Sequence, residues 1–110
     1  MNYTKEQQLG KRTKKKSKNF TEKTKRDIFE RDNWQCVKCG SHLIESVPHH
    51  IIYKSAGGTG EKRNGVTVCR NCHDWAHHKK DSKFGEPSRE GRKWFEKWRD
   101  ENLDENGDRI

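Results

Sequence analysis

The stretch that decides the fold lies between residues 36 and 77, and it reads CVKC at 36–39, PHHII at 48–52 and NGVTVCRNCH at 64–73. It holds four cysteines in two CxxC pairs, and His77 closes it four residues after His73. Each pair offers two thiolates, and two pairs complete the tetrahedron that Zn²⁺ prefers. Four thiolates leave no open position for water, so such a zinc ion is structural. The predicted zinc ligands are Cys36, Cys39, Cys69 and Cys72.

The composition supports a small domain that needs a metal. Of 110 residues, 26% are hydrophobic and 38% are charged, too polar a balance for a large apolar core. The CxxC pairs, with no signal-like apolar run, favour zinc in a reducing compartment over two disulfides. No apolar run is long enough to span a membrane. We therefore predict a cytoplasmic protein without a membrane partner.

The positive charge is concentrated ahead of the cysteines. The net charge is +8, and residues 1–28 hold ten Lys or Arg against three acidic residues, a balance of +7. A basic arm beside a compact domain suits a polyanionic partner, because each lysine that neutralises a phosphate releases a counterion. A solubilising tail is the alternative. The arm residues predicted to contact DNA are Lys14, Lys15 and Lys16.

The predicted elements follow from caps, β-branched residues and glycines. Thr21 suits a helix cap, and Ile28 and Phe29 give the first helix a buried side. The glycine-rich segment between the histidine pair and Asn64 reads as a loop. The predicted elements are a helix at 21–31, strands at 46–53 and 66–68, a helix at 69–80 and a last helix at 89–102.

Four segments organise the chain. The core of the chain holds the cysteines and histidines, and a Gly-Glu-Pro-Ser break at 85–88 precedes the last helix. We expect the C-terminal tail to be loose. The predicted segments are a disordered basic arm at 1–19, the core domain at 20–80, a helical extension that packs on it at 81–103 and an acidic tail at 104–110.

In its cysteines, His49, His50, Asn64 and His73, the sequence resembles the HNH endonuclease family, in the version whose ββα-metal motif is tied by a four-cysteine zinc. The resemblance covers residues 26–80. It implies a small α+β fold, with a zinc-stapled ββα-metal (His-Me finger) core and flanking N- and C-terminal helices. Many relatives have Asp where this chain has His49.

The resemblance assigns roles to the histidine pair and to Asn64. It makes His50 the general base that activates water, a task that suits imidazole near physiological pH. It makes His49 a ligand of the catalytic metal and Asn64 a structural member that holds His50 in place. The alternative for the pair is two incidental polar residues on a half-buried strand. For Asn64, ordinary turn chemistry ahead of Gly65 is compatible with the assigned role.

His73 and His77 are four residues apart on a predicted helix, so they share one face. With His49 they would form a three-histidine metal site, which resembles that of DNA-degrading colicins. For His77, contact with the scissile phosphate is the alternative. The expected catalytic ion is Mg²⁺ or Mn²⁺, as the family implies, with Zn²⁺, Ni²⁺ or Co²⁺ as alternatives because imidazole favours them.

Further basic and aromatic residues are candidates for DNA contact. The aromatic stripe of the last helix packs on the core or, alternatively, enters a DNA groove as a wedge. The basic residues contact phosphates or, alternatively, lie on a solvated loop. The stripe is Trp94, Phe95 and Trp98, and the basic residues are Lys54, Lys62, Arg63 and Arg70.

The function that the resemblance implies is a metal-dependent endonuclease that nicks or cuts double-stranded DNA. Small lysine-rich proteins of this kind are frequent in phages and mobile elements, so a phage packaging or other DNA-processing protein is a candidate partner. We expect a monomer or a weak dimer. The alternatives are a zinc-dependent DNA-binding module without cleavage and a zinc-stapled protein-interaction domain.

Overall fold

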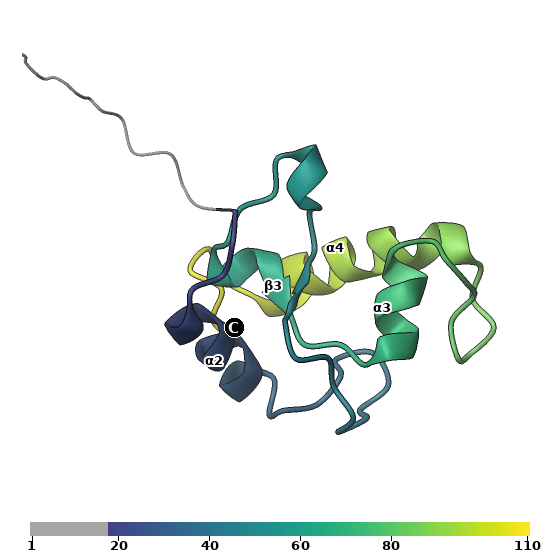
Figure 1. Cartoon of the computed structure of the whole chain (residues 1–110), viewed down its shortest axis with the longest axis horizontal. Coiled ribbons are helices and arrows are strands. Elements are labelled where there is room, and N and C mark those ends of the chain that lie inside the picture. Colours follow the sequence, from purple (N-terminus) through teal and green to yellow (C-terminus); the bar gives the residue numbers. More distant parts are fainter. Residues whose placement is uncertain (1–17) are drawn as a thin grey trace, which may run out of the picture.

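The computed structural model describes residues 18–110, so Lys14, Lys15, Lys16 and most of the predicted arm lie outside the described residues. Within 18–110, three α-helices and a two-stranded antiparallel sheet form a small α+β fold, as predicted (Figure 1). The elements are α2 (Glu22–Arg31), β2 (His49–His50), β3 (Gly65–Val66), α3 (Arg70–Ala76) and α4 (Gly91–Asn102), with 3₁₀ turns at Lys54–Ala56, Lys62–Asn64 and Ser88–Glu90.

Helix α2 begins and ends where the sequence predicts. The Thr21 hydroxyl accepts a hydrogen bond from the Thr24 N–H at 3.1 Å, which satisfies one of the free donors at the helix start. The helix ends at Arg31, and Asn33 and Trp34 follow with φ angles of 58° and 56°. Non-glycine residues in this left-handed region cannot continue a right-handed helix.

Strands β2 and β3 form one antiparallel pair at the centre of the molecule, with His49 opposite Val66 and His50 opposite Gly65 (Figure 1). Successive side chains of a strand point to opposite faces. His49 is buried, whereas its neighbour His50 is half-buried. The pairing therefore directs the two histidines into different surroundings.

Each strand is only two residues long, and both strands predicted from the sequence are too long. The Asn64 side chain bonds both the N–H and the C=O of Ile52, at 2.8 and 3.1 Å. The Asp32 carboxylate accepts the N–H of Thr67 at 3.0 Å. Beyond one further backbone bond, from the Ile51 N–H to the Asn64 carbonyl at 2.9 Å, side chains occupy the backbone groups that would continue the ladder.

Helix α3 is shorter than the predicted helix at 69–80. It ends at Ala76, and His78 has a φ angle of 62°, which turns the chain away. The N–H of Lys79 then bonds the carbonyl of Asp74 at 2.9 Å, so the last turn closes its free carbonyl groups. The Tyr53 hydroxyl donates to the Ala76 carbonyl and holds the helix end against the loop after β2.

Helix α4 packs against α3 and completes the core. Phe95 is fully buried and Trp98 is 9% exposed, while Trp94 is partly buried against the same cluster. The aromatic stripe of α4 therefore packs on the core, the first of the two interpretations. The core cluster consists of Cys36, Ile51, Val66, Val68, Cys69, Cys72, Trp75, Ala76, Phe95, Trp98 and Leu103.

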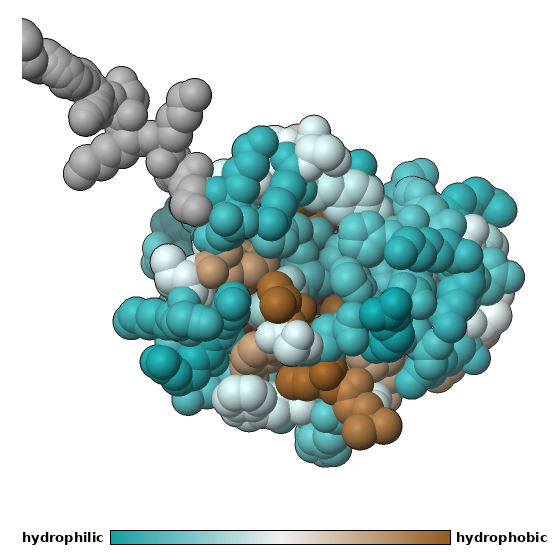
Figure 2. Space-filling view, viewed as in Figure 1, coloured by the Kyte–Doolittle hydropathy of each residue, from teal (hydrophilic) through white to brown (hydrophobic). Residues whose placement is uncertain are grey.

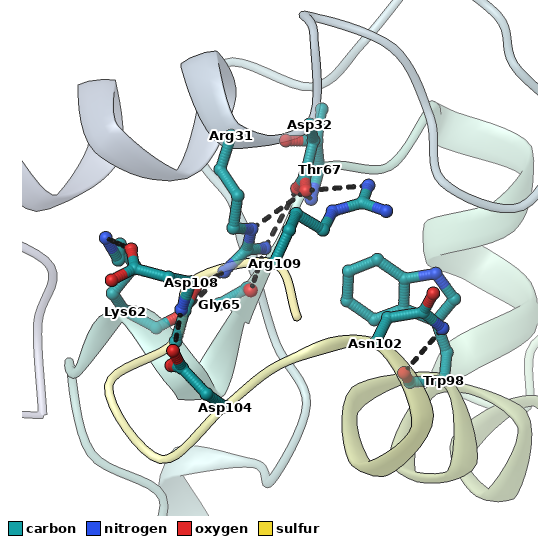
Figure 3. A network of polar contacts seen from close by, with 11 residues as sticks. Arg31, Asp32, Lys62, Gly65, Thr67, Trp98, Asn102, Asp104, Asp108 and Arg109 are labelled. Carbon is teal, nitrogen blue, oxygen red and sulfur yellow. Dashed lines mark hydrogen bonds and ion pairs between the residues drawn. The ribbon is translucent and has the colours of Figure 1, made fainter.

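The expectation that the C-terminal tail is loose is wrong. Leu103 is buried and forms an isolated bridge with Arg109, and the guanidinium of Arg109 lies 3.4 Å from the Asp32 carboxylate. Arg31 donates to the carbonyl of Gly107 at 3.0 Å, and Figure 3 shows Arg109 reaching the carboxylate of Asp32. The tail packs because it supplies partners for a charge pair at the end of α2, and Figure 1 shows the C-terminus beside that helix.

The face shown in Figure 2 is mostly hydrophilic, with hydrophobic side chains gathered in one area below the strand pair. This surface agrees with a chain that is 38% charged. Among residues 18–110, none of the helices has the length and apolar character that crossing a membrane requires.

Candidate functional site

The four cysteines form one cluster positioned to bind a metal. Cys36 and Cys39 lie in the loop after α2, Cys69 caps α3 and Cys72 lies in its first turn. Gly40, with a φ angle of 77°, closes the first loop and lets its N–H bond the Cys36 carbonyl at 2.8 Å. The predicted cysteines are therefore brought together by a turn and by the start of a helix.

The sulfur geometry fits zinc. All four Sγ atoms lie within 4.8 Å of one another, and those of Cys39 and Cys69 are 3.6 Å apart. A tetrahedral ion with Zn–S bonds of about 2.3 Å places its sulfur ligands about 3.8 Å apart. The contact between Cys36 and Cys72 lowers the pKa of Cys36 to about 4 and raises the pKa of Cys72. This cluster indicates a structural zinc site.

A second cluster consists of His49 from β2, His73 from α3 and His77, the residue that follows α3. One ring nitrogen of each lies within 4.8 Å of the others, and the Nε2 atoms of His73 and His77 are 3.1 Å apart. A single ion bonded to both nitrogens at about 2.1 Å would hold them roughly 3.0–3.4 Å apart. The pair spacing therefore fits a shared metal ion.

His49 is the buried member of this second cluster. It is 3% exposed, and its Nε2 atom has no hydrogen-bond partner among residues 18–110. Burial, with smaller contributions from His73 and His77, lowers the pKa of His49 to about 2. The ring is therefore neutral at physiological pH and keeps a lone pair. A buried nitrogen without a partner costs free energy, which a metal ion bonded to it would offset.

Glu45 orients His73, and sequence reasoning missed it. Its Oε1 atom lies 3.3 Å from Nδ1 of His73 and 3.5 Å from a guanidinium nitrogen of Arg70. A carboxylate accepts the proton on Nδ1, which leaves Nε2 free to bind a metal, the arrangement that metal-binding histidines commonly have. A bridge between Ile44 and Cys69 places Glu45 here. No local spacing in the sequence signals such a contact.

Tyr53 supports His77 and was also missed. The two rings stack with centroids 4.9 Å apart and planes 18° apart, and the guanidinium carbon of Arg92 lies 5.0 Å from the centroid of the Tyr53 ring. Burial is the main cause that lowers the pKa of His77, so this ring too is biased toward its neutral form. His77 is the cap of α3, one residue beyond the helix, yet its N–H still bonds the His73 carbonyl at 3.1 Å.

His50 lies in the same cavity as the histidine cluster. This cavity has a volume of about 470 Å³, and its lining includes His49, His50, His73, His77 and Lys54. Burial is the main cause that lowers the pKa of His50, the Lys54 charge adds to this effect, and a bond to a backbone carbonyl opposes it. A neutral imidazole in a cavity that three further histidines line can accept a proton from water.

Asn64 ties the loop that follows β2. Its amide accepts from the Ile52 N–H at 2.8 Å and donates to the carbonyls of Ile52 and Thr59 at 3.1 and 2.9 Å. Asn64 is 8% exposed, so these bonds are shielded from water. The amide bridges backbone groups across the glycine-rich loop, and its role in holding His50 in place stays a prediction.

The predicted DNA-binding residues differ in position. Of those that the structure describes, Lys54 alone lines the cavity. Lys62 pairs with Asp108. The Arg63 guanidinium lies 3.3 Å from the carboxylate of Asp100. Arg70 lies beside Glu45 on the flank of α3, and three-quarters of its side chain is exposed. The contact of these four residues with DNA stays a prediction.

The sequence of the chain was compared with protein families, with known proteins and with solved structures. The chain matches the family model described as HNH endonuclease over residues 36–79. It is similar to Anaredoxin from Nostoc sp. (strain PCC 7120), with 30% identity over 55 residues, which make up 50% of this chain and 72% of that protein. No solved structure matches the chain at a significant level.

Proposed function

The chain belongs to the HNH endonuclease family, and we propose that it is a metal-dependent endonuclease that hydrolyses phosphodiester bonds in double-stranded DNA. In this proposal β2, β3 and α3 form the ββα-metal unit, which the four-cysteine zinc staples. Domains of this family act on DNA, and the net charge of +8 suits such a polyanion.

The observation that carries the proposal is the convergence of three histidine nitrogens beside a fourth histidine. His49, His73 and His77 could together hold one ion, and His50 lines the same cavity. A protein that only bound DNA would not need a buried nitrogen without a partner, which is costly in free energy. A catalytic metal would explain that cost.

The proposed mechanism divides the work among the residues of the cavity. His50 takes a proton from water, whose oxygen bonds to phosphorus, and the bond from phosphorus to the 3′ oxygen breaks. The products are a 5′ phosphate and a 3′ hydroxyl. When bound, the divalent ion supplies charge stabilisation to the phosphate and to the leaving oxygen. Asn64 holds the loop and Lys54 faces the phosphate.

Mg²⁺ and Mn²⁺ are our first candidates for the catalytic ion, with Zn²⁺, Ni²⁺ or Co²⁺ next because three imidazoles favour them. We further propose a setting in a phage or another mobile element, in a reducing cytoplasm. The proposed oligomeric state is a monomer or a weak dimer. A DNA-processing protein is the proposed partner.

Plasmid relaxation by the purified protein tests the proposal. We expect cleavage with Mg²⁺ or Mn²⁺, and loss of at least a hundredfold in rate for His50→Ala, because general base catalysis is worth roughly 10²–10⁴. His42→Ala is the matched control, since His42 is exposed and lies outside the cavity. The added ion should be withdrawn by dialysis, because a strong chelator would also remove the cysteine-bound zinc.

The products then separate the alternatives. Intact plasmid with every ion, together with a salt-sensitive gel shift, would contradict cleavage and favour a zinc-dependent DNA-binding module. Cleavage that survives His50→Ala at full rate would show that another residue is the base. The ratio of nicked to linear product would report whether one or two strands are cut.

A further inference from the structure

A short segment ahead of the family match lies directly against His50. The carbonyl oxygen of Lys18 is 2.6 Å from Nε2 of His50. The ring of Phe20 stacks on the His50 ring, with centroids 4.1 Å apart and planes 27° apart. Phe20 is 7% exposed, so this stack is part of the interior. Residues 18–20 precede the matched range of 36–79.

Residues 19 and 20 pack closely against Gly60, Gly65 and Lys54. A Cβ on Gly60 would lie 2.2 Å from the Asn19 carbonyl oxygen, and a Cβ on Gly65 would lie 3.0 Å from the Phe20 ring. At Gly60 the neighbouring atoms are backbone, so a larger residue there would push the segment away, whereas at Gly65 the side chains of Ile28 and Phe20 would have to shift. Lys54 also donates to the Asn19 side chain at 2.7 Å.

The contact decides which nitrogen of His50 is basic. A backbone carbonyl can only accept a hydrogen bond, so Nε2 of the neutral ring must carry the proton. The lone pair then lies on Nδ1. In a general base, the partner of one ring nitrogen determines which nitrogen takes the substrate proton.

We propose that residues 18–20 are a positioning element of the catalytic site, in which the Lys18 carbonyl selects the Nε2–H form of His50 and Phe20 holds its ring in place. This inference rests on the proposed nuclease function. The water proton passes to Nδ1, the new oxygen–phosphorus bond forms, and the 3′ oxygen leaves with the bonding electrons and takes a proton from solvent. The family match alone does not contain this element.

Nuclear magnetic resonance of the intact protein with ¹⁵N-labelled histidine tests whether the Lys18 carbonyl selects the Nε2–H form of His50. At pH 8 the two-bond proton–nitrogen pattern of His50, assigned by its disappearance in His50→Gln, should show a protonated Nε2 and an unprotonated Nδ1. A protonated Nδ1 would overturn the proposal. This readout needs no cleavage, so it stands whether or not the protein is a nuclease.

Steady-state cleavage by the Phe20→Leu variant tests whether Phe20 holds the His50 ring in place. We expect kcat to fall about tenfold or more with KM within twofold, because a misplaced catalytic group affects the chemical step and not DNA binding. Phe29→Leu is the matched control. Phe29 is 8% exposed and stacks on Trp34 with centroids 5.0 Å apart. The ring that stacks on His50 is that of Phe20, not that of Phe29. Zinc content and melting temperature are measured for both variants.

The outcomes separate this proposal from the proposed function. Equal kcat for Phe20→Leu and Phe29→Leu would overturn the positioning role while leaving the nuclease intact. If Phe20→Leu loses zinc and does not fold, the protonation pattern of His50 in the unaltered protein decides. If the unaltered protein cleaves DNA with none of the ions, the proposed nuclease function is wrong. The catalytic role of residues 18–20 is then wrong as well.

Discussion

At the scale of single residues, the histidine cluster depends on which nitrogen each ring presents. His49 is neutral because burial lowers its pKa to about 2, and its Nε2 is left without a partner in the described chain. Glu45 accepts from Nδ1 of His73 and leaves Nε2 facing His77. The first effect comes from desolvation and the second from a hydrogen bond, yet both make a nitrogen available as a ligand.

We predict that Glu45→Gln lowers the cleavage rate about 10- to 100-fold and weakens binding of the catalytic ion by a similar factor, because outer partners of metal-binding histidines contribute this much. The measurements are cleavage rate against Mn²⁺ concentration and zinc content by mass spectrometry. Zinc content should not change, since Glu45 does not touch the cysteine cluster.

Asp74→Asn is the matched control for Glu45→Gln. Asp74 also pairs with Arg70, at 3.6 Å, but has no contact with the His73 ring in the structure. An equal loss in both variants would assign the effect to Arg70 and contradict an orienting role for Glu45.

At the scale of elements, the backbones of α3 and α4 approach each other closely at Gly91. A Cβ at this position would lie 2.2 Å from the Trp75 carbonyl oxygen and 2.9 Å from Cα of Ala76. Backbone atoms cannot move aside as a flexible side chain can. The start of α4 is therefore bound to the end of α3, where His73 and His77 lie.

We predict that Gly91→Ala lowers the free energy of unfolding by about 1–3 kcal/mol, the usual cost of overpacking, although alanine is the better helix former. Lys93→Ala, an exposed change in the same helix, should stay within about 0.5 kcal/mol. Urea unfolding followed by circular dichroism measures both. A stabilised Gly91→Ala would show that the helices separate at little cost.

At the scale of the whole molecule, a buried ion pair at the end of α2 contacts the C-terminal tail. The side chains of Arg31 and Asp32 are 5% and 0% exposed, and their charged atoms are 2.9 Å apart. Arg31 also donates to the carbonyls of Lys62 and Gly65 (Figure 3) and to the carbonyl of Gly107. One residue thus connects α2, the strand pair and the C-terminal tail.

We predict that Arg31→Met lowers the free energy of unfolding by about 3–5 kcal/mol, because it leaves the Asp32 carboxylate buried without its main partner. Arg26→Met, an exposed change in the same helix, should have little effect. Urea unfolding gives the values. If the double variant Arg31→Met and Asp32→Asn is as unstable as the single one, the loss comes from packing and hydrogen bonds, and the charge argument fails.

The sequence by itself determined the small α+β class, the zinc cysteines, the family and the ends of α2, because these depend on spacing and on caps within a few residues. The i, i+4 spacing put His73 and His77 on one helix face, and the family resemblance proposed His49 as a further ligand and Asn64 as a structural member of the site. The local rules overestimated both strands, since side chains from elsewhere take the backbone bonds that would extend them, and α3, since the chain turns at His78.

Only the tertiary structure decided the partners that lie far apart in the chain. Glu45 reaches His73, the Lys18 carbonyl reaches His50, and the tail residue Arg109 reaches Asp32. Each contact joins residues 28 or more positions apart, and it depends on where the whole chain runs. The physical reason is that a ligand set can be read from residue types at short spacing. The groups that orient those ligands are chosen by packing.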